Sequence, residues 1–362
     1  MTPDNSNTGE GIKEPEIHAK KAFPIVLLII LVGIFAFVGS LIHSTFGFKN
    51  FYAITSSFIT APINKIVSNG GRTNILIMGK SGGSHDGPDL TDTMILVSVS
   101  LTQPKVTAIS IPRDLWIPEI RAKINSAYYW GDKKTPYFDN SKNQDGKIGF
   151  AKTITAEVIG EPIQYGVVID FSAFKDVVDA LGGIRVVVDN SFTDKLYPIA
   201  GRENDPCGGD PTFACRYQTV SFNVGPQTMN GDTALIFVRS RHAEGDEGTD
   251  TARETRQQKV IDAIKKKITT PLVFLSPKID LAMLNVLKKY VETDLNSTSA
   301  AIIVRKAVEG GKSINQFLIP QELLFNPPIS KTYDSQYVFI PKAGNGKWEE
   351  VQKWVFEALT FN

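Results

Sequence analysis

The chain has 362 residues, of which 42% are hydrophobic and 21% are charged, and its formal net charge is +1 at pH 7. These values describe an ordinary globular protein that is long enough to bury a sizeable core. A net charge so close to zero gives no support for nucleic-acid binding, so we expect no nucleic acid as a partner. Any functional charge is therefore local.

Residues 22–42 carry no charged side chain and consist mostly of Ile, Leu, Val and Phe. As a helix this stretch is about long enough to cross a bilayer core of roughly 30 Å. Lys20 and Lys21 precede it and no charge follows before Lys49, so the positive-inside rule predicts a cytoplasmic N-terminus. A cleaved signal peptide is the alternative, although its short apolar region and A-x-A-like cleavage site are missing. We expect a single-pass protein of the cell membrane, with everything beyond about residue 43 outside the cytoplasm.

Strand and helix patterns alternate from residue 73 onward. The expected strands are Asn74–Gly79, Thr93–Val99, Val106–Ile111, Gly166–Asp170 and Ile184–Val188, and the expected helices are Ile148–Gly160 and Ser172–Leu181. Ser172 is a candidate N-cap of the second helix, which Gly182 and Gly183 would end. Residues 277–362 indicate further helices and an edge strand at Tyr337–Ile340. Such alternation is typical of a layered α/β domain.

We expect one folded domain outside the membrane, because no clear linker interrupts it. The predicted division is a cytoplasmic tail at 1–21, a transmembrane helix at 22–42, a juxtamembrane stalk at 43–71, a catalytic domain at 72–350 and the C-terminal end of that domain at 351–362.

The segment Val238–Gln258 concentrates basic side chains. Its arginines are Arg239, Arg241, Arg253 and Arg256. The first two follow the apolar run 234–238, which we interpret as a buried strand, so they would leave its end on one face. The last two and Gln257 have i, i+3, i+4 spacing and can share one face of a helix. Converging guanidinium groups suit a phosphate or pyrophosphate. A salt-bridged surface helix is the alternative.

Two further charged positions lie where expected strands end. Asp92 follows a polar, glycine-rich loop that lacks the P-loop pattern, and Arg113 with Asp114 follows the strand that Pro112 ends. Ligands of α/β sheets bind at strand ends. The alternatives are a turn or capping role for Asp92 and a structural ion pair for Arg113 and Asp114.

Cys207 and Cys215 bracket a short polar loop. A disulfide explains them better than a zinc site, which would need about two more ligands, and two free thiols are the remaining alternative. Residues 139–148 weakly resemble a calcium loop, but Lys152 stands where a bidentate Glu is needed, so we interpret them as a solvated turn. His85 and His242 are interpreted as loop residues.

Six segments, in order over residues 73–262, together resemble the LytR-CpsA-Psr family of membrane-anchored glycopolymer transferases. They read NILIMG, LTDTMIL, SIPRD, KINSAY, VIDFSAFKDVVDALGGIRV and GDTALIFVRSRH…DTARETRQQ. The resemblance implies a layered α-β-α domain with a mixed central sheet and an apolar tunnel for a lipid tail. It also implies transfer of a glycan and its proximal phosphate from a polyprenyl-pyrophosphate carrier to a peptidoglycan hydroxyl.

The resemblance also implies roles for individual residues. The pyrophosphate would be held by Arg113, Arg239, Arg241, Arg253 and Gln257. Asp92 would bind Mg²⁺ as the cofactor, and Asp92, Arg113 and Arg241 would be the catalytic residues.

The chain departs from the family pattern at two positions. Leu90 stands where an Arg is usual, and Lys80 stands where an Asp usually follows the first strand. We hypothesise that Asp86 supplies the second metal carboxylate, ahead of Asp89, because Pro88 stiffens the chain beside Asp89. Hydrolysis of polyprenyl pyrophosphates and non-catalytic binding of lipid-linked glycans are the alternative functions.

Overall fold

The computed structural model describes residues 61–80, 87–133, 146–268, 270, 276–309 and 314–360. The expected transmembrane helix at 22–42 lies outside these residues, as do Asp86, His85 and most of the calcium-like loop. Within the described part of the chain, no helix is long and apolar enough to cross a membrane.

A six-stranded mixed sheet forms the centre of the molecule, in the order β11-β6-β1-β2-β3-β12. Its strands are β1 (Arg72–Lys80), β2 (Thr91–Ser100), β3 (Val106–Ile111), β6 (Tyr165–Asp170), β11 (Val291–Thr293) and β12 (Ile314–Leu318). β2 is antiparallel to β1 and β3, whereas β6 runs parallel to β1 and β12 runs parallel to β3. The predicted strands at 74–79, 93–99, 106–111 and 166–170 are thereby confirmed.

Helices cover both faces of this sheet, as the α-β-α prediction requires. Leu76 and Met78 of β1 belong to a core that includes side chains of α3 (Ala127–Trp130), α4 (Gly146–Ile159) and α11 (Glu349–Thr360). Ile75 and Ile77 alternate with them and belong to a second core with α10 (Ser297–Glu309). The chain before β1 also covers this second face, because Ala61 and Ile66 are buried there.

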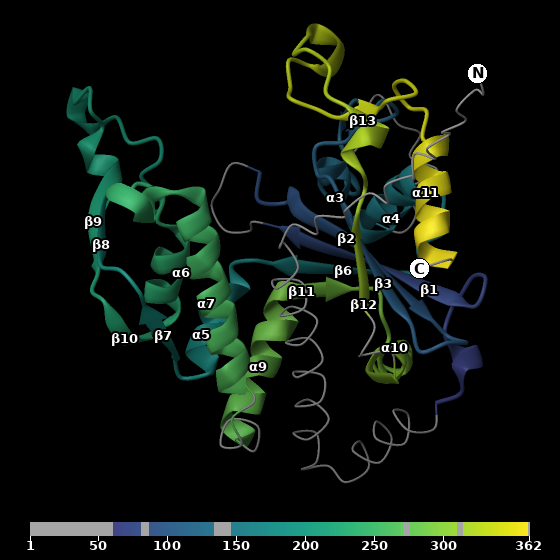
Figure 1. The fold of residues 1–362 in the computed structure, drawn as a ribbon, viewed down its shortest axis with the longest axis horizontal. Helices are drawn as coiled ribbons and strands as arrows, with labels where there is room; N and C mark the ends of the chain where they lie inside the picture. The colour runs from purple at the N-terminus through teal and green to yellow at the C-terminus, as the bar shows by residue number, and fades with distance from the viewer. Residues whose placement is uncertain are drawn as a thin grey trace, which may run out of the picture.

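Residues 171–290 form a second lobe with its own apolar core, and we call it the arginine lobe. The rest of the described chain is the sheet lobe, and the two stand side by side in Figure 1. The arginine lobe contains α5 (Ala173–Ala180), β7 (Ile184–Val188), β8 (Phe192–Pro198), β9 (Tyr217–Phe222), β10 (Gly225–Met229), α6 (Gly231–Arg239), α7 (Asp250–Ile268) and α9 (Pro277–Tyr290). It leaves the sheet after β6 and returns at β11.

The predicted start of α5 is partly wrong and its predicted end is right. Ser172 holds the N-cap position, but no side-chain capping bond forms there, because its hydroxyl donates to Asp170 Oδ1 at 2.6 Å. Gly182 and Gly183 end the helix with φ of +72° and +85°, a left-handed conformation that costs a glycine little.

The apolar run 234–238 is helical, so the predicted strand there is wrong. It lies in α6, where the side chain of Asn230 accepts a hydrogen bond from the Thr233 N–H at 2.9 Å and caps the helix. The backbone of α5 at Lys175 approaches Gly231 so closely that a Cβ would not fit. Capping and helix packing thus override the strand-like composition of the run.

The C-terminal region contains the predicted helices α9, α10 and α11, but its edge strand is shorter than expected. Within 337–340, Phe339 makes an isolated bridge to Leu115, and Ile340 begins the two-residue strand β14 (Ile340–Pro341). β14 pairs with β13 (Leu324–Phe325). A second short hairpin joins β4 (Trp116–Ile117) to β5 (Ala122–Lys123).

Candidate active site

One edge of the central sheet collects the charged residues that the sequence singled out. β1 and β3 run in the same direction and end at this edge, where β2 begins. Lys80 is the last residue of β1, Asp92 lies at the start of β2, and Arg113 follows β3. The arginine lobe leaves the sheet lobe from the same edge, because β6 is parallel to β1. Ligands of α/β sheets bind at strand ends, so this edge, beside the arginine lobe, is the candidate site.

A β-bulge places Asp92 at this edge. Gly79 pairs with Thr93, but Lys80 pairs with Thr91, so Asp92 is an extra residue in β2 with no partner of its own in the ladder. Bulges of this kind re-aim a side chain and are common next to active sites.

The side chains of Asp92 and Arg113 meet. Arg113 Nη1 donates to Asp92 Oδ1 at 2.6 Å, and Arg113 Nε lies 3.5 Å from Asp114 Oδ2. The arginine side chain is 51% exposed and that of Asp92 is 34% exposed. An ion pair this exposed contributes little to stability, but a ligand from solvent can reach it.

The backbone of Asn125 links the two chain segments that carry these side chains. Its N–H donates to Arg113 O at 3.3 Å, and its carbonyl accepts the Thr91 hydroxyl at 3.0 Å. Beside it, Lys123 Nζ donates to Asp114 Oδ1 at 2.7 Å. The alternative of a structural ion pair is thus present, since Arg113 and Asp114 contact each other and pair with Asp92 and Lys123, respectively.

A second group of charges begins at Lys80. Its ammonium lies 3.2 Å from Asp89 Oδ1 and 3.4 Å from Glu292 Oε1, and Lys147 Nζ lies 2.8 Å from Asp89 Oδ2. Tyr128 is buried beneath them and donates to Glu292 Oε2 at 2.6 Å. This group explains how the chain accommodates a lysine where a carboxylate was expected.

Proton affinities in this group follow from its contacts. Partial burial alone would raise the pKa of the Asp89 carboxyl, but the hydrogen bonds from Lys147 and Lys80 outweigh it and lower the pKa. Burial would lower the pKa of Lys147, but the bond to Asp89 raises it. Burial and the bond to Glu292 raise the pKa of the Tyr128 phenol, which therefore stays protonated and acts as a fixed donor.

Sequence reasoning singled out part of this second group and missed the rest. The sequence marks Lys80 as a departure from the family pattern and Asp89 as the second choice for a metal carboxylate, and Tyr128 lies within a segment that carries the family resemblance. Lys147 lies in the calcium-like loop, for which the sequence predicts a solvated turn, and Glu292 belongs to no motif and is 212 positions from Lys80. Asp86, predicted as a metal ligand, lies outside the described residues.

The arginine lobe holds the predicted pyrophosphate ligands on α6, α7 and the loop between them. Arg239 is the last residue of α6, and Arg241 lies in the loop; both are exposed. The fully buried carboxylate of Asp194 fixes this loop, since its Oδ2 accepts the N–H groups of Arg241 and His242 at 3.1 and 3.2 Å. Arg253 and Gln257 are partly exposed on α7.

Arg256 does not share their face, so the prediction that three helical side chains point the same way is wrong. The residue is only 3% exposed. Its guanidinium donates to the carbonyls of Phe237 and Ser240 at 3.1 and 2.8 Å and forms a 2.7 Å ion pair with Glu247. Spacing alone could not reveal this, because it does not show which face of α7 packs against α6.

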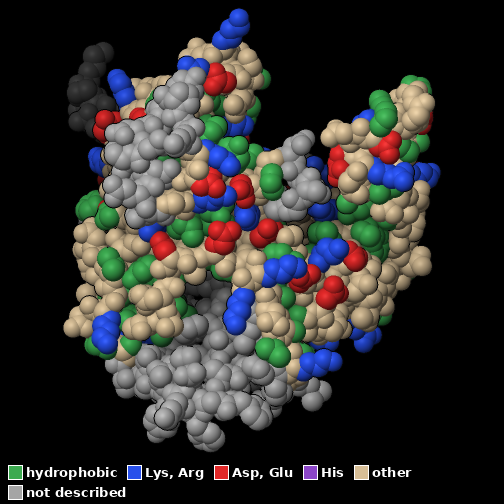
Figure 2. Space-filling view, turned by 180° about the vertical axis from the view of Figure 1, so that it is seen from behind, with side chains coloured by type: hydrophobic (Ala, Val, Ile, Leu, Met, Phe, Trp, Pro, Cys, Tyr) green, Lys and Arg blue, Asp and Glu red, His purple; other side chains and the backbone are tan. Residues whose placement is uncertain are grey.

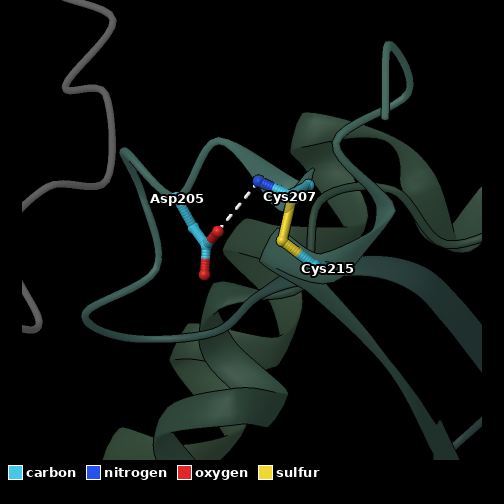
Figure 3. A group of neighbouring side chains, drawn as sticks. All are labelled: Asp205, Cys207 and Cys215. Atoms are coloured by element: carbon cyan, nitrogen blue, oxygen red, sulfur yellow. Dashed lines mark hydrogen bonds between the residues drawn. A yellow bond between two sulfur atoms is a disulfide. The ribbon is translucent and has the colours of Figure 1, made fainter. Parts of the chain in front are cut away.

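Cys207 and Cys215 form a disulfide at the end of the hairpin between β8 and β9 (Figure 3). Asp205 Oδ1 accepts the Cys207 N–H at 2.8 Å. In the described residues these three are the one group of at least three side chains close enough to hold a metal, but bonded sulfurs are not thiolate ligands. The disulfide prediction is confirmed.

The surface of the molecule carries both signs of charge. Figure 2, seen from behind, shows Lys, Arg, Asp and Glu side chains mixed across the centre of that face. They lie below a notch between two raised parts of the surface, of which the one at the right is the hairpin end of the arginine lobe. Charge is thus concentrated locally although the net charge is +1.

Residues 51–353 match the model of the LytR_cpsA_psr family. Biofilm regulatory protein A of Streptococcus mutans is 28% identical over 233 residues, which cover 63% of this chain and 51% of that protein. The polyisoprenyl-teichoic acid–peptidoglycan teichoic acid transferase TagU of Bacillus licheniformis is 28% identical over 254 residues, covering 66% of this chain and 70% of that protein. The chain thus spans about half the length of the first relative.

Two solved structures are also similar to this chain. The crystal structure of TagV from Bacillus subtilis is 24% identical, with a TM-score of 0.44, and the alignment covers 82% of this chain and 100% of that one. A structure of TagT bound to LI-WTA is 20% identical, with a TM-score of 0.43, 83% coverage of this chain and 95% of that one. Because the family match extends over most of its length, the chain belongs to the LytR_cpsA_psr family.

Proposed function

We propose that this protein is a membrane-anchored phosphotransferase that moves a glycopolymer from a polyprenyl-pyrophosphate carrier onto a peptidoglycan hydroxyl. Family membership and relatives named as teichoic acid transferases support transfer of a glycopolymer to peptidoglycan. The observation that carries the proposal is the exposed Asp92–Arg113 pair, at the sheet edge from which the arginine lobe emerges.

The proposed reaction is one phosphoryl transfer. The acceptor hydroxyl oxygen bonds to the phosphorus next to the sugar, and the bond from that phosphorus to the bridging oxygen breaks. Polyprenyl phosphate leaves with the bridging oxygen and takes up the hydroxyl proton. Arg113 would bind the phosphate oxygens from the sheet lobe, while Arg239, Arg241, Arg253 and Gln257 would bind from the arginine lobe. Such side chains stabilise charge that develops on the leaving phosphate.

Magnesium at Asp92 is what the family resemblance implies. Mg²⁺ prefers oxygen ligands in an octahedral arrangement. The described residues do not fit a site with two carboxylates, because Lys80 replaces one of them and Asp89 is bound by Lys80 and Lys147. Arg113 also binds Asp92. In the proposed reaction the charge is therefore neutralised by cationic side chains of the chain itself.

The full-length protein in proteoliposomes, given a polyprenyl-pyrophosphate-linked glycan with and without peptidoglycan, tests the reaction. Glycan attached to peptidoglycan, together with polyprenyl phosphate, is the expected product. Release of the lipid without attachment would identify the protein as a hydrolase. Binding without turnover would identify it as a lipid-linked glycan binding or scaffold protein.

The proposed topology has its own test. A cytoplasmic N-terminus and an outer domain follow from Lys20 and Lys21, which oppose translocation. Protease added to spheroplasts should digest residues 43–362 and leave an N-terminal tag protected. Protection of the domain, with digestion of the tag, would reverse this topology.

A further inference from the structure

Two lysines from separate elements converge on one carboxylate at the sheet edge. Lys80 ends β1 and Lys147 lies in the first turn of α4, yet both ammonium groups lie within 3.2 Å of Asp89, one on each carboxylate oxygen. Both also lie above the ring of Tyr128, at 5.4 and 5.2 Å from its centre. We call these four residues the lysine clamp.

We propose that the lysine clamp is a phosphate subsite that lets this protein bind a lipid pyrophosphate without a divalent metal. The inference rests on the proposed function and deepens it, because it assigns hydrogen-bond donors for a phosphate at the sheet edge to Lys80 and Lys147.

The clamp has donors for a phosphate. An ammonium group carries three N–H donors. Among the described residues, the partners of Lys80 are Asp89 and Glu292, and those of Lys147 are Asp89 and Asp132. With two carboxylate partners each in the described part of the chain, both ammonium groups have a third N–H there that a phosphate between them could engage in charge-assisted hydrogen bonds.

The lysines are fixed before a ligand arrives. Their side chains are only 14% and 26% exposed, and the buried ring of Tyr128 lies below both. The ring favours cations over its face, and its hydroxyl is held by Glu292 at 2.6 Å. Little side-chain entropy remains to be lost on binding, so each hydrogen bond to phosphate contributes more to affinity.

The same contacts disfavour a divalent ion at this position. A metal would have to compete with two ammonium groups for Asp89, and both oxygens of that carboxylate are already engaged. The hydrogen bonds from Lys147 and Lys80 hold the pKa of Asp89 low, so its charge stays matched to the lysines. A phosphate, by contrast, accepts hydrogen bonds from the ammonium groups and does not compete with them for Asp89.

The clamp lies beside the Asp92–Arg113 pair. Lys80 pairs in the sheet with Thr91, the neighbour of Asp92, and Thr91 is tied through Asn125 to Arg113. The clamp and Arg113 therefore belong to one edge, and a pyrophosphate has two phosphate groups for them to bind.

Binding of farnesyl pyrophosphate to the full-length protein in detergent, measured by calorimetry in EDTA and in excess Mg²⁺, tests the inference. The wild-type affinity should agree within about threefold between the two conditions. Lys80→Met and Lys147→Met should each lower the affinity in EDTA by about tenfold to a hundredfold, which is typical for hydrogen bonds to charged groups. Lys80→Asp, which introduces a carboxylate, should bind only in Mg²⁺.

Lys306→Met is the matched control, since Lys306 is 15% exposed and paired with Glu309 at 2.7 Å on α10, across the sheet. Its affinity should equal that of the wild type. Wild-type binding that requires Mg²⁺ would overturn the clamp and leave the proposed function standing. Unchanged affinity in both folded methionine variants would also overturn it. No binding in either condition would defeat the proposed function and the inference together.

Discussion

The buried carboxylate of Asp194 accepts a hydrogen bond from the backbone N–H of Arg241, which is 47 positions away in sequence. It also accepts from the N–H groups of His242 at 3.2 Å and Leu196 at 2.9 Å. One side chain thereby joins β8 to the loop that carries Arg241. Asp194 is a positioning residue in the proposed site, since it holds the backbone from which a predicted phosphate ligand projects.

Asp194→Asn should weaken lipid-pyrophosphate binding without changing the KM for the peptidoglycan acceptor. The amide keeps one acceptor oxygen but sets an NH₂ group against backbone donors, which should also lower the free energy of unfolding by about 1–3 kcal/mol. Calorimetry and urea unfolding measure the two effects. Asp210→Asn is the control, because Asp210 accepts backbone bonds from Thr212 and Ala214 elsewhere in the lobe. Equal affinities for both variants would contradict the positioning role.

Arg113→Ala should lower the affinity for farnesyl pyrophosphate by about tenfold to a hundredfold, because a charge-assisted bond contributes about 1.5–3 kcal/mol. Arg113→Lys should recover only part of the loss, since lysine lacks the planar fork. Arg121→Ala is the control. Arg121 lies in the turn between β4 and β5, its side chain is 45% exposed, and it forms an ion pair with Asp334. Wild-type affinity in the Arg113→Ala variant would remove this residue from the site.

Arg253 and Arg256 lie one turn apart on α7, and their alanine variants should affect different properties: Arg256→Ala should lower stability, and Arg253→Ala should weaken binding. Loss of Arg256 leaves Glu247 without its buried partner and should reduce the free energy of unfolding by about 3–5 kcal/mol. Loss of Arg253, which is partly exposed, should change stability by less than about 1 kcal/mol and weaken lipid-pyrophosphate binding. Urea unfolding and calorimetry on both variants check this. A destabilised Arg253→Ala variant would indicate a structural role instead.

The lysine clamp should also appear in the pH dependence of stability. The folded pKa of Asp89 is lowered, so its contribution is present above the unfolded pKa of about 3.9 and is lost as the pH falls through the folded value. Asp89→Asn should therefore destabilise the protein at pH 6 and much less at pH 3. Urea midpoints of both proteins at the two pH values measure the difference. An equal loss at both would show that Asp89 does not stabilise through its charge.

Removing the disulfide should destabilise the arginine lobe. Loop-closure entropy predicts a loss of about 2–3 kcal/mol for the Cys207→Ser and Cys215→Ser double variant. Neither cysteine is among the residues that the proposed reaction uses, so turnover at low temperature should be unchanged. Thermal unfolding with and without dithiothreitol should show the same shift in the wild type. A large loss of turnover in the folded variant would show that the hairpin takes part in binding.

Local patterns predicted much of this protein because short-range physics determines them. The apolar runs of β1, β2 and β3 form a sheet wherever their side chains can be buried on both faces. Charged residues at the ends of such strands must then come to the edge of the sheet, so the presence of Asp92 and Arg113 at that edge could be anticipated. The two glycines after α5 stop the helix for an equally local reason.

Tertiary structure decided the features that depend on contacts between residues far apart in the sequence. The run 234–238 is apolar enough for a strand, and only its cap at Asn230 and its packing on α5 make it a helix. Arg253 and Arg256 look alike in sequence, but α7 buries one of them against α6. Lys80 finds Glu292 across 212 positions because β6 and β11 pair beside β1. Sequence thus determined which residues can carry charge to the edge, and long-range packing decided which of those charges meet.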